Sequence, residues 1–145
     1  MQTYLVDIDD TVYSRTYQLD DALTTLPYIT PFDFVQDFCE RHTTVFVSKG
    51  DPLLQMRKLR ILGLLHTADS VHIVQKNVDK RIAFELYKSA IVIGNRRDAE
   101  VRQGNLAGHK TVLIKHGKYA CMPIEGPHDV ANIEVDTFAD FINYK

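Results

Sequence analysis

Cysteines and long hydrophobic runs are both scarce in this 145-residue chain. The two cysteines, Cys39 and Cys121, are far apart and neither belongs to a CxxC pair, so we expect no structural disulfide in a domain this rich in apolar residues. No apolar stretch reaches the roughly 18 residues of a membrane-spanning helix. The first apolar segment follows no basic residue and contains Asp7, which argues against a signal peptide. These features predict a cytoplasmic protein that does not enter a membrane.

The sequence also lacks internal repeats, low-complexity tracts, linkers and a strong excess of one charge. Hydrophobic residues make up 45% of the chain and charged residues 25%, which is typical of a globular protein. The length fits a single domain over residues 1–145. The net charge of -2 does not indicate a nucleic-acid partner. The six histidines show no spacing such as HxxxH, so a histidine-based metal site is not expected.

Short apolar segments, rich in Val and Ile, alternate with helical patterns along the chain. Near-continuous apolar runs of this kind are typical of parallel strands that are covered on both faces. The alternation predicts an α/β fold of three layers, Rossmann-like, with a five-stranded parallel sheet. The five expected strands are Thr3–Ile8, Thr43–Ser48, Ser70–Val74, Ala90–Gly94 and Lys110–Ile114.

Helix boundaries are indicated by capping residues and prolines. A Thr, Asp or similar residue before a proline is a common helix start, and a glycine is a common stop. The expected helices begin at Thr30-Pro31, run from Asp51-Pro52 to about Leu62, span Asp79–Tyr87 and Asp98–Ala107, and begin after a cap at Asp136. In such folds ligands bind beyond the carboxyl ends of the strands, so the residues that follow each strand are the candidate site.

Three carboxylates, those of Asp7, Asp9 and Asp10, follow the first expected strand. Like charges at the end of a buried strand repel one another, and partial burial increases the cost. A hard cation such as Mg²⁺ would neutralise them. An exposed acidic turn is the alternative, and this segment alone favours neither reading.

Polar side chains also follow the second and third strands. Ser48, with Lys49 and Gly50 behind it, precedes a helix N-terminus, where a hydroxyl and backbone amides can bind phosphate oxygens. Lys76 lies two residues beyond the third strand and can neutralise a phosphate; Lys80 is a competitor that begins to lie on the next helix. A plain loop and a solvated lysine are the alternatives, and each is favoured when its segment is taken alone.

The fourth strand is followed by Asn95 and by the acids Asp98 and Glu100. Their oxygens could complete a metal site, although Asp98 could also simply cap the next helix. Because the carboxyl ends of parallel strands share one edge of the sheet, all four polar segments would converge there.

Several other polar residues are weighed against plain surface roles. Tyr13, Arg15 and Tyr17 are candidates for substrate contact or for aromatic packing in a surface loop. Basic residues at other places are interpreted as solvated: Arg57, Lys58 and Arg60 on a helix face, Arg96-Arg97 at a helix start, and the loop Lys115–Lys118, which could alternatively steer phosphorylated polymers.

The motifs, taken in order, resemble those of the haloacid dehalogenase-like superfamily. Its first motif is an apolar strand followed by Asp-x-Asp-x-Thr, and a Ser or Thr, a Lys and an acidic segment follow along the chain. The matching residues are Asp7, Asp9, Thr11, Ser48, Lys76 and the segment Gly94–Glu100. The resemblance covers roughly residues 1–119, and the four motifs in this order are far more specific than any one of them.

The resemblance implies a Mg²⁺-dependent phosphomonoester hydrolase that acts on a phosphorylated small molecule or macromolecule. Asp7 would be the nucleophile that forms an aspartyl-phosphate, Asp9 the general acid and base, and Lys76 the offset for the negative charge. The implied phosphate-binding residues are Thr11, Ser48 and Lys49. The implied Mg²⁺ ligands are Asp7, Asp9 through its backbone carbonyl, Asn95 and Glu100, with Asp98 as the alternative to Glu100.

Two features depart from the larger members of this superfamily. Asn95 stands where the family usually has Asp, which predicts weaker Mg²⁺ binding and leaves open a catalytically weak or inactive binding module. The chain also has no room for a cap domain, because residues 12–29 form only a short flap and no large insert separates Ser48 from Lys76. Capless relatives tend to act on large substrates or to cover each other's sites as homo-oligomers.

Overall fold

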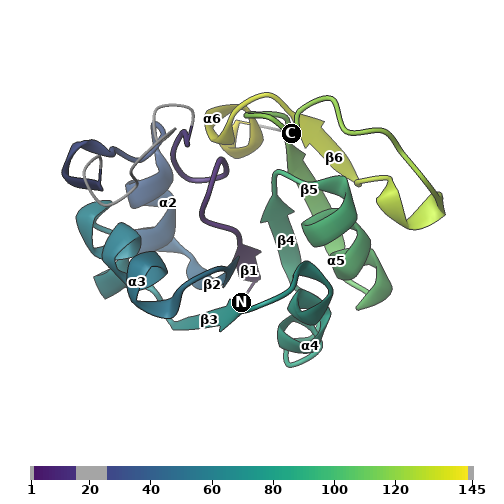
Figure 1. The fold of residues 1–145 in the computed structure, drawn as a ribbon, viewed down its shortest axis with the longest axis horizontal. Helices are drawn as coiled ribbons and strands as arrows, with labels where there is room; N and C mark the ends of the chain where they lie inside the picture. Colours follow the sequence, from purple (N-terminus) through teal and green to yellow (C-terminus); the bar gives the residue numbers. More distant parts are fainter. Residues whose placement is uncertain (1, 16–25, 144–145) are drawn as a thin grey trace.

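The computed structural model describes residues 2–15 and 26–143 and contains a parallel sheet of six strands in the order β3-β2-β1-β4-β5-β6 (Figure 1). All neighbouring strands pair in parallel. The strands are β1 Thr3–Val6, β2 Thr43–Lys49, β3 Ser70–Val74, β4 Ile91–Gly94, β5 Lys110–Ile114 and β6 Ile133–Val135. The α/β class and the five expected strands are confirmed, but the count of five is wrong because β6 adds an edge strand.

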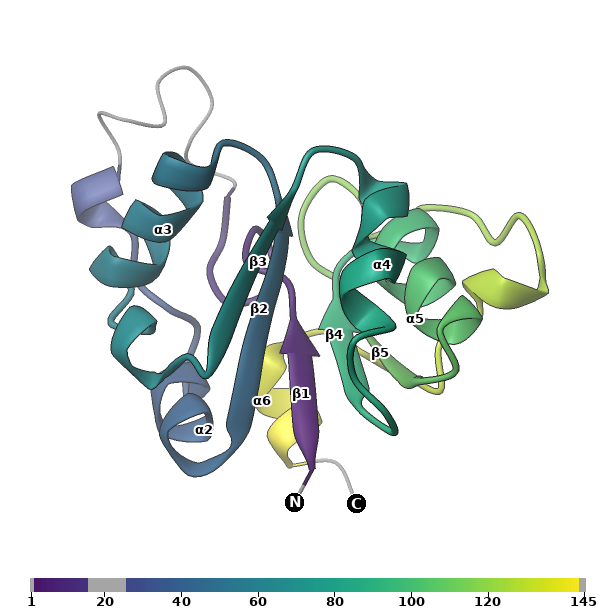
Figure 2. The same ribbon diagram turned by 90° about the horizontal axis from the view of Figure 1, so that it is seen from below.

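Helices cover both faces of the sheet (Figure 2). On one face, α2 (Val35–Arg41), α3 (Pro52–Ile61) and α6 (Phe138–Ile142) pack on a core that includes Val6 and Phe46. On the other face, α4 (Lys80–Phe84) and α5 (Arg102–Leu106) cover Leu5 and Val92. Adjacent residues Leu5 and Val6 thus face opposite cores, as expected for a central strand buried on both sides.

Two of the expected helix starts are corrected by the structure. Thr30 does not open a helix: α2 begins at Val35, after Phe34, whose φ of 70° is in the left-handed region and interrupts any helix from Thr30. The C-terminal helix is capped by Thr137 instead of Asp136, since the Thr137 hydroxyl accepts a hydrogen bond from the Asp140 N–H at 3.1 Å.

The start of α3 agrees with the sequence. The Asp51 carboxylate accepts a hydrogen bond from the Leu54 N–H at 2.9 Å, and Pro52 occupies the first helical position. Proline is tolerated there because the first N–H groups of a helix have no partner within the helix. The positive φ of 72° at Gly63 then marks the turn that leads out of this helix.

The third and fourth expected helices are shorter than predicted, and each follows a turn of tighter or wider helical geometry. A 3₁₀ turn, Asn77–Asp79, precedes the short helix α4, and a π-helical turn, Arg97–Val101, precedes α5. The remaining 3₁₀ turns are Leu26–Tyr28, Leu65–Thr67 and Pro127–Asp129. These two interrupted segments follow β3 and β4, and they determine which polar residues reach the carboxyl edge of the sheet.

No folded insert separates β2 from β3 in the described part of the chain, where only α3 and a 3₁₀ turn connect them. Residues 16–25 of the expected flap 12–29, with Tyr17 among them, lie outside the described residues. None of the helices within residues 2–15 and 26–143 has the length and hydrophobicity needed to cross a membrane.

Candidate active site

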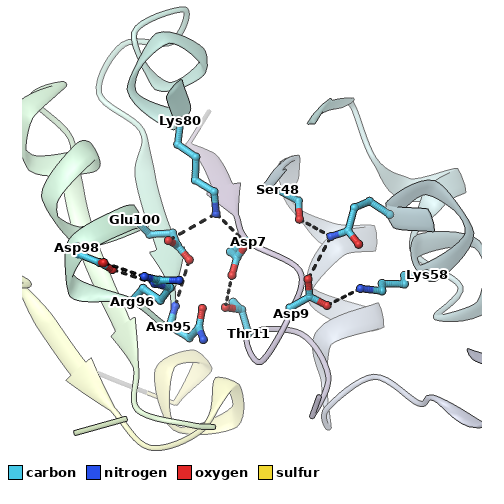
Figure 3. A network of polar contacts seen from close by, with 11 residues as sticks. Asp7, Asp9, Thr11, Ser48, Lys58, Lys80, Asn95, Arg96, Asp98 and Glu100 are labelled. Atoms are coloured by element: carbon cyan, nitrogen blue, oxygen red, sulfur yellow. Dashed lines mark hydrogen bonds and ion pairs between the residues drawn. The ribbon is translucent and has the colours of Figure 1, made fainter. Parts of the chain in front are cut away.

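Asp7 lies at the centre of the carboxyl edge of the sheet, directly after β1 (Figure 3). Its backbone N–H donates to the Ile93 carbonyl at 3.0 Å, which fixes the residue between β1 and β4. Its side chain is 7% exposed, and one oxygen, Oδ2, accepts a hydrogen bond from the Thr11 hydroxyl at 3.2 Å. The carboxylate is therefore held in one position by its own loop.

Lys80 provides the positive charge beside Asp7. The Lys80 Nζ lies 3.1 Å from Asp7 Oδ1 and 3.5 Å from Glu100 Oε2, and the side chain is 3% exposed. Burial acts to lower the pKa of Lys80, but the charges of Asp7 and Glu100 outweigh it and raise the pKa. The expected residue, Lys76, is exposed, because the 3₁₀ turn after β3 carries the chain past the site before α4 turns it back. The structure thus places Lys80, and not Lys76, beside Asp7.

Glu100 reaches the site from the π-helical turn after β4. It is 1% exposed and packs directly on Gly94, where an added Cβ would be 2.1 Å from the Glu100 Cγ. Asp98, the alternative acid, instead accepts two hydrogen bonds of 2.8 and 2.7 Å from Arg96 (Figure 3). The geometry thus favours Glu100 over Asp98 as the acid near Asp7.

The Asn95 carboxamide lies against both buried acids. With its nitrogen turned inward it donates to Asp7 Oδ2 at 3.0 Å and to Glu100 Oε1 at 3.3 Å. With its oxygen turned inward, it faces only other oxygens, an arrangement that a cation would stabilise. A carboxamide can satisfy either situation because its oxygen accepts and its nitrogen donates.

The residues around Asp7 carry more negative than positive charge. Burial, followed by the nearby charge of Asp7, raises the pKa of Glu100. Glu100 Oε2 accepts no hydrogen bond within the described residues and has only the Lys80 ammonium at 3.5 Å. Two buried acids therefore share one lysine, and a bound cation would relieve the imbalance.

Mg²⁺ fits this donor set only with the help of neutral oxygens. No group of three or more His, Cys, Asp or Glu side chains within residues 2–15 and 26–143 is arranged to hold a metal ion. Asp7 and Glu100 supply two carboxylates, and the Asn95 carbonyl and the backbone carbonyl of Asp9 are the further oxygens available. Hard oxygen ligands of this kind, completed by water, suit Mg²⁺.

The Asp9 side chain belongs to a separate polar cluster with α3 (Figure 3). It accepts hydrogen bonds from Lys58 Nζ at 2.8 Å, from Gln55 Nε2 at 3.2 Å and from the Tyr13 hydroxyl. Burial alone would raise the pKa of Asp9, but the charge and hydrogen bond of Lys58, and then Tyr13, lower it below its usual value. Its side chain is thus committed to this cluster as a carboxylate and is not directed at the point between Asp7 and Glu100.

The sequence interpretation missed this cluster. Lys58 was expected on a solvated face with Arg57 and Arg60, yet its side chain is only 4% exposed. The signal was present: Gln55, Lys58, Leu59 and Leu62 recur at the spacing of one buried helix face. Tyr13, a candidate for substrate contact, is fully buried against Asp9 instead.

The expected phosphate-binding residues lie at the same edge. The Ser48 hydroxyl is buried and accepts a hydrogen bond from Gln55 Nε2. Lys49 is exposed on the wall of a pocket with a volume of about 510 Å³. The residues that line this pocket are Asp7, Asp9, Asp10, Arg15, Lys49, Gly50, Asn77, Lys80, Asn95, Arg96, Glu100, Gly117, Lys118 and Tyr119.

The fold and the sequence can both be compared with known proteins. No family model matches the chain. A stretch of 101 residues, 62% of the chain, is 33% identical to the glyceraldehyde 3-phosphate phosphatase of Methanopyrus kandleri and covers 43% of that protein. The chain thus matches less than half of the length of this relative.

Solved structures resemble the whole described fold. A haloacid dehalogenase-like hydrolase from Burkholderia xenovorans superposes with a TM-score of 0.79 at 16% identity, over 99% of this chain and 95% of that one. The HAD hydrolase YfnB of Bacillus subtilis, whose structure is bound to magnesium, superposes with a TM-score of 0.75 at 14% identity, over 98% and 97%. The resemblance seen in the motifs extends to the fold: the chain has the fold of these haloacid dehalogenase-like hydrolases.

Proposed function

We propose that the protein is a Mg²⁺-dependent phosphomonoester hydrolase with Asp7 as nucleophile. The observation that carries the proposal is the setting of Asp7: a buried carboxylate, fixed by Thr11 and Lys80, that lines an open pocket together with Asn95 and Glu100. A carboxylate held in this way is prepared for attack on an electrophile, since little reorganisation is needed. The similarity to a phosphatase supports phosphorus as that electrophile.

The reaction would proceed in two displacements at phosphorus. An Asp7 oxygen forms a bond to phosphorus while the bond to the leaving alkoxide breaks, and the alkoxide takes a proton from Asp9. Because the pKa of Asp9 is lowered in the free protein, this step requires the nearby charge of the bound phosphate to raise that pKa, so that Asp9 takes up the proton that it donates. Water then attacks the aspartyl-phosphate, gives a proton back to Asp9, and releases inorganic phosphate and free Asp7. Lys80 offsets negative charge on Asp7 and on the phosphoryl oxygens. Mg²⁺, held by Asp7, Asn95, Glu100 and the Asp9 carbonyl, would supply further positive charge.

Ser48 and Lys49 would bind the phosphoryl oxygens from the β2 side of the pocket. Lys58, Gln55 and Tyr13 would position the Asp9 carboxyl group, which is 18% exposed and lines the same pocket. In this arrangement Lys58, Gln55 and Tyr13 each have a role, and the Asp9 side chain is not a ligand of the metal.

A second candidate function is favoured by Asn95. With its nitrogen turned inward, the carboxamide satisfies both buried acids by hydrogen bonds, so the site is balanced without a metal. A protein of this kind would be a binding or regulatory module that keeps the fold and releases no phosphate from any ester at saturating Mg²⁺.

Phosphate release distinguishes the two functions. The assay uses p-nitrophenyl phosphate and a panel of phosphomonoesters that includes glyceraldehyde 3-phosphate, with Mg²⁺ and with EDTA. We expect Mg²⁺-dependent release that Asp7→Asn abolishes while circular dichroism shows an intact fold. Turnover that survives Asp7→Asn would refute the nucleophile, and no release from any ester would favour the binding module.

A matched pair of variants tests the metal ligands. Glu100→Gln is expected to raise strongly the Mg²⁺ concentration that turnover requires, because one of only two side-chain carboxylates at the proposed metal site is lost. Asp98→Asn, two residues away, is expected to leave that concentration unchanged, since Asp98 forms an ion pair with Arg96. The reverse ranking would show that Asp98 is the ligand.

A further inference from the structure

Four loops at the carboxyl edge of the sheet each contribute one cationic side chain to the pocket. Arg15 follows β1, Lys49 ends β2, Arg96 follows β4 and Lys118 follows β5. The chain as a whole carries a net charge of -2, so these cations are concentrated against an acidic average. Their arrangement around one pocket requires an explanation of its own.

Arg96 is already neutralised, whereas the other three cations are not. Arg96 forms two hydrogen bonds with Asp98, and its guanidinium lies 3.9 Å from the centre of the Tyr119 ring. Arg15, Lys49 and Lys118 are exposed, and their side chains form no ion pair with any residue in the described ranges 2–15 and 26–143. They are therefore available to a ligand.

Three of the acids in the pocket have a closer cation than Arg15, Lys49 or Lys118. Asp7 and Glu100 contact Lys80, and Asp9 contacts Lys58, at distances of 2.8 to 3.5 Å. The phosphate to be cleaved would lie against this inner set. Arg15 and Lys118, which line the same pocket, are then left for the rest of the substrate.

The pocket also has more room than one phosphoryl group fills. Its volume is about 510 Å³, whereas a phosphoryl group of a few heavy atoms takes roughly 100 Å³, about three times the share of one water molecule. Several further heavy atoms can be accommodated beside it. A ligand that filled this space would meet at least one of the three unpaired cations.

We propose that the substrate is a small phosphomonoester with a second anionic group, either a carboxylate or another phosphate, which Arg15 and Lys118 bind while Lys49 contacts the phosphoryl group. This inference rests on the proposed hydrolase function and specifies its substrate class. Opposite charges that meet at the mouth of a pocket increase both the binding and the rate of encounter. A phosphomonoester of equal size without a second anionic group would lack that attraction.

Matched substrates test the second anion directly. The first pair is 3-phosphoglycerate and glycerol 3-phosphate, which differ in a carboxylate against a hydroxymethyl group. The second pair is 1,3-propanediol bisphosphate and its monophosphate. In at least one pair, we expect kcat/KM for the compound with two anionic groups to exceed that for its partner by about tenfold. This ratio should fall as salt is added. The pair with the larger ratio identifies the second anion as carboxylate or phosphate.

Charge-removing variants assign the effect to the loops. In Arg15→Met and Lys118→Met the ratio within the preferred pair is expected to fall towards one, and to fall furthest in the double variant. Lys110→Met is the matched control, because this exposed lysine begins β5 at the opposite end of the strand, and the ratio should be kept there. Equal loss in Lys110→Met would overturn the assignment to the loops.

A binding measurement separates this inference from the hydrolase proposal. Calorimetry on Asp7→Asn compares the same pairs without turnover. We expect the ligand with two anionic groups to bind about tenfold more tightly than its partner. Hydrolysis with no preference in either pair would overturn the second-anion proposal while it leaves the hydrolase intact. Hydrolysis confined to phosphorylated polymers would likewise overturn it. Absence of all hydrolysis would refute the hydrolase, and the calorimetric ratio would still decide on the anion site.

Discussion

Replacement of Lys80 by methionine is expected to destabilise the protein far more than replacement of Lys76. Among the residues that the structure describes, Lys80 is the one cation in contact with both Asp7 and Glu100, whose side chains are 7% and 1% exposed. Removing one partner of a buried ion pair typically costs about 3–5 kcal/mol, because the remaining charge is left unpaired. Glu100 can take up a proton, since its pKa is already raised, and this limits the loss. We therefore expect Lys80→Met to lower the free energy of unfolding by about 3–4 kcal/mol.

Urea denaturation followed by far-ultraviolet circular dichroism, at neutral pH in EDTA, measures this difference. Lys76→Met is the matched control: the side chain is exposed, so its replacement should change the free energy of unfolding by less than about 0.5 kcal/mol. Mg²⁺ should recover part of the stability lost in Lys80→Met, because a cation bound between the acids replaces the missing charge. Equal losses in the two variants would refute the assignment of Lys80 as the partner of Asp7.

Further expected outcomes concern the residues after β4. Asn95→Asp adds a third carboxylate, so in thermal denaturation it should melt lower than the parent in EDTA yet gain more from Mg²⁺; an equal gain would contradict Asn95 as a ligand. Gly94→Ala should lower the free energy of urea unfolding by about 1–3 kcal/mol, since its Cβ would lie 2.1 Å from Glu100 Cγ, whereas Gly126→Ala, with no atom within 4 Å, should have little effect. Burial and the charge of Asp7 raise the pKa of Glu100, so between about pH 5 and about pH 8 the folded protein keeps a proton that the unfolded chain has lost. Without metal, the free energy of unfolding should therefore fall as the pH rises through this range. Urea titrations at both pH values should show that slope, and Glu100→Gln should reduce it.

The fold was largely predictable because the strands carry a local signal. The five expected strands are continuous apolar runs, and central parallel strands need no more than that. The sixth strand, Ile133–Val135, is three residues long with an exposed Glu134 at its centre, and it lies at the edge of the sheet. Such a segment forms by pairing with β5, and this long-range pairing leaves little trace in the local sequence.

The candidate site was predictable as a set of strand ends but not in every side chain. Asp7 and Asn95 directly follow β1 and β4, and Ser48 lies at the end of β2, so the strand positions determine where they lie. Lys80 does not, because the turn Asn77–Asp79 decides which lysine returns to the sheet, and a long flexible side chain reaches the rest of the way. The choice among neighbouring acids and lysines depends on turn geometry that composition and periodicity do not specify.

The contact between Asp9 and Lys58 was missed for another reason. A lysine on a helix is solvated in most proteins, so the buried position of Lys58 conflicts with the usual behaviour of its residue type. It is tolerated because the ammonium contacts the carboxylate of Asp9, in the loop after β1, 49 residues away in the chain. Buried charges of this kind are visible in sequence only as an interruption of an apolar face, and the pattern alone does not name the partner.

The central position of β1 couples the assembly of the site to the order in which the chain is synthesised. β1 leaves the ribosome first, yet its two neighbours begin at Thr43 and Ile91, so its second edge stays unpaired until most of the chain has emerged. Non-local parallel pairing of this kind folds slowly. Until α4 docks, Asp7 has no lysine beside it, and burying its charge is unfavourable. The acidic end of β1 should therefore remain hydrated in any partly folded nascent chain, and the central sheet and the reactive carboxylate should acquire their native form in a single late step.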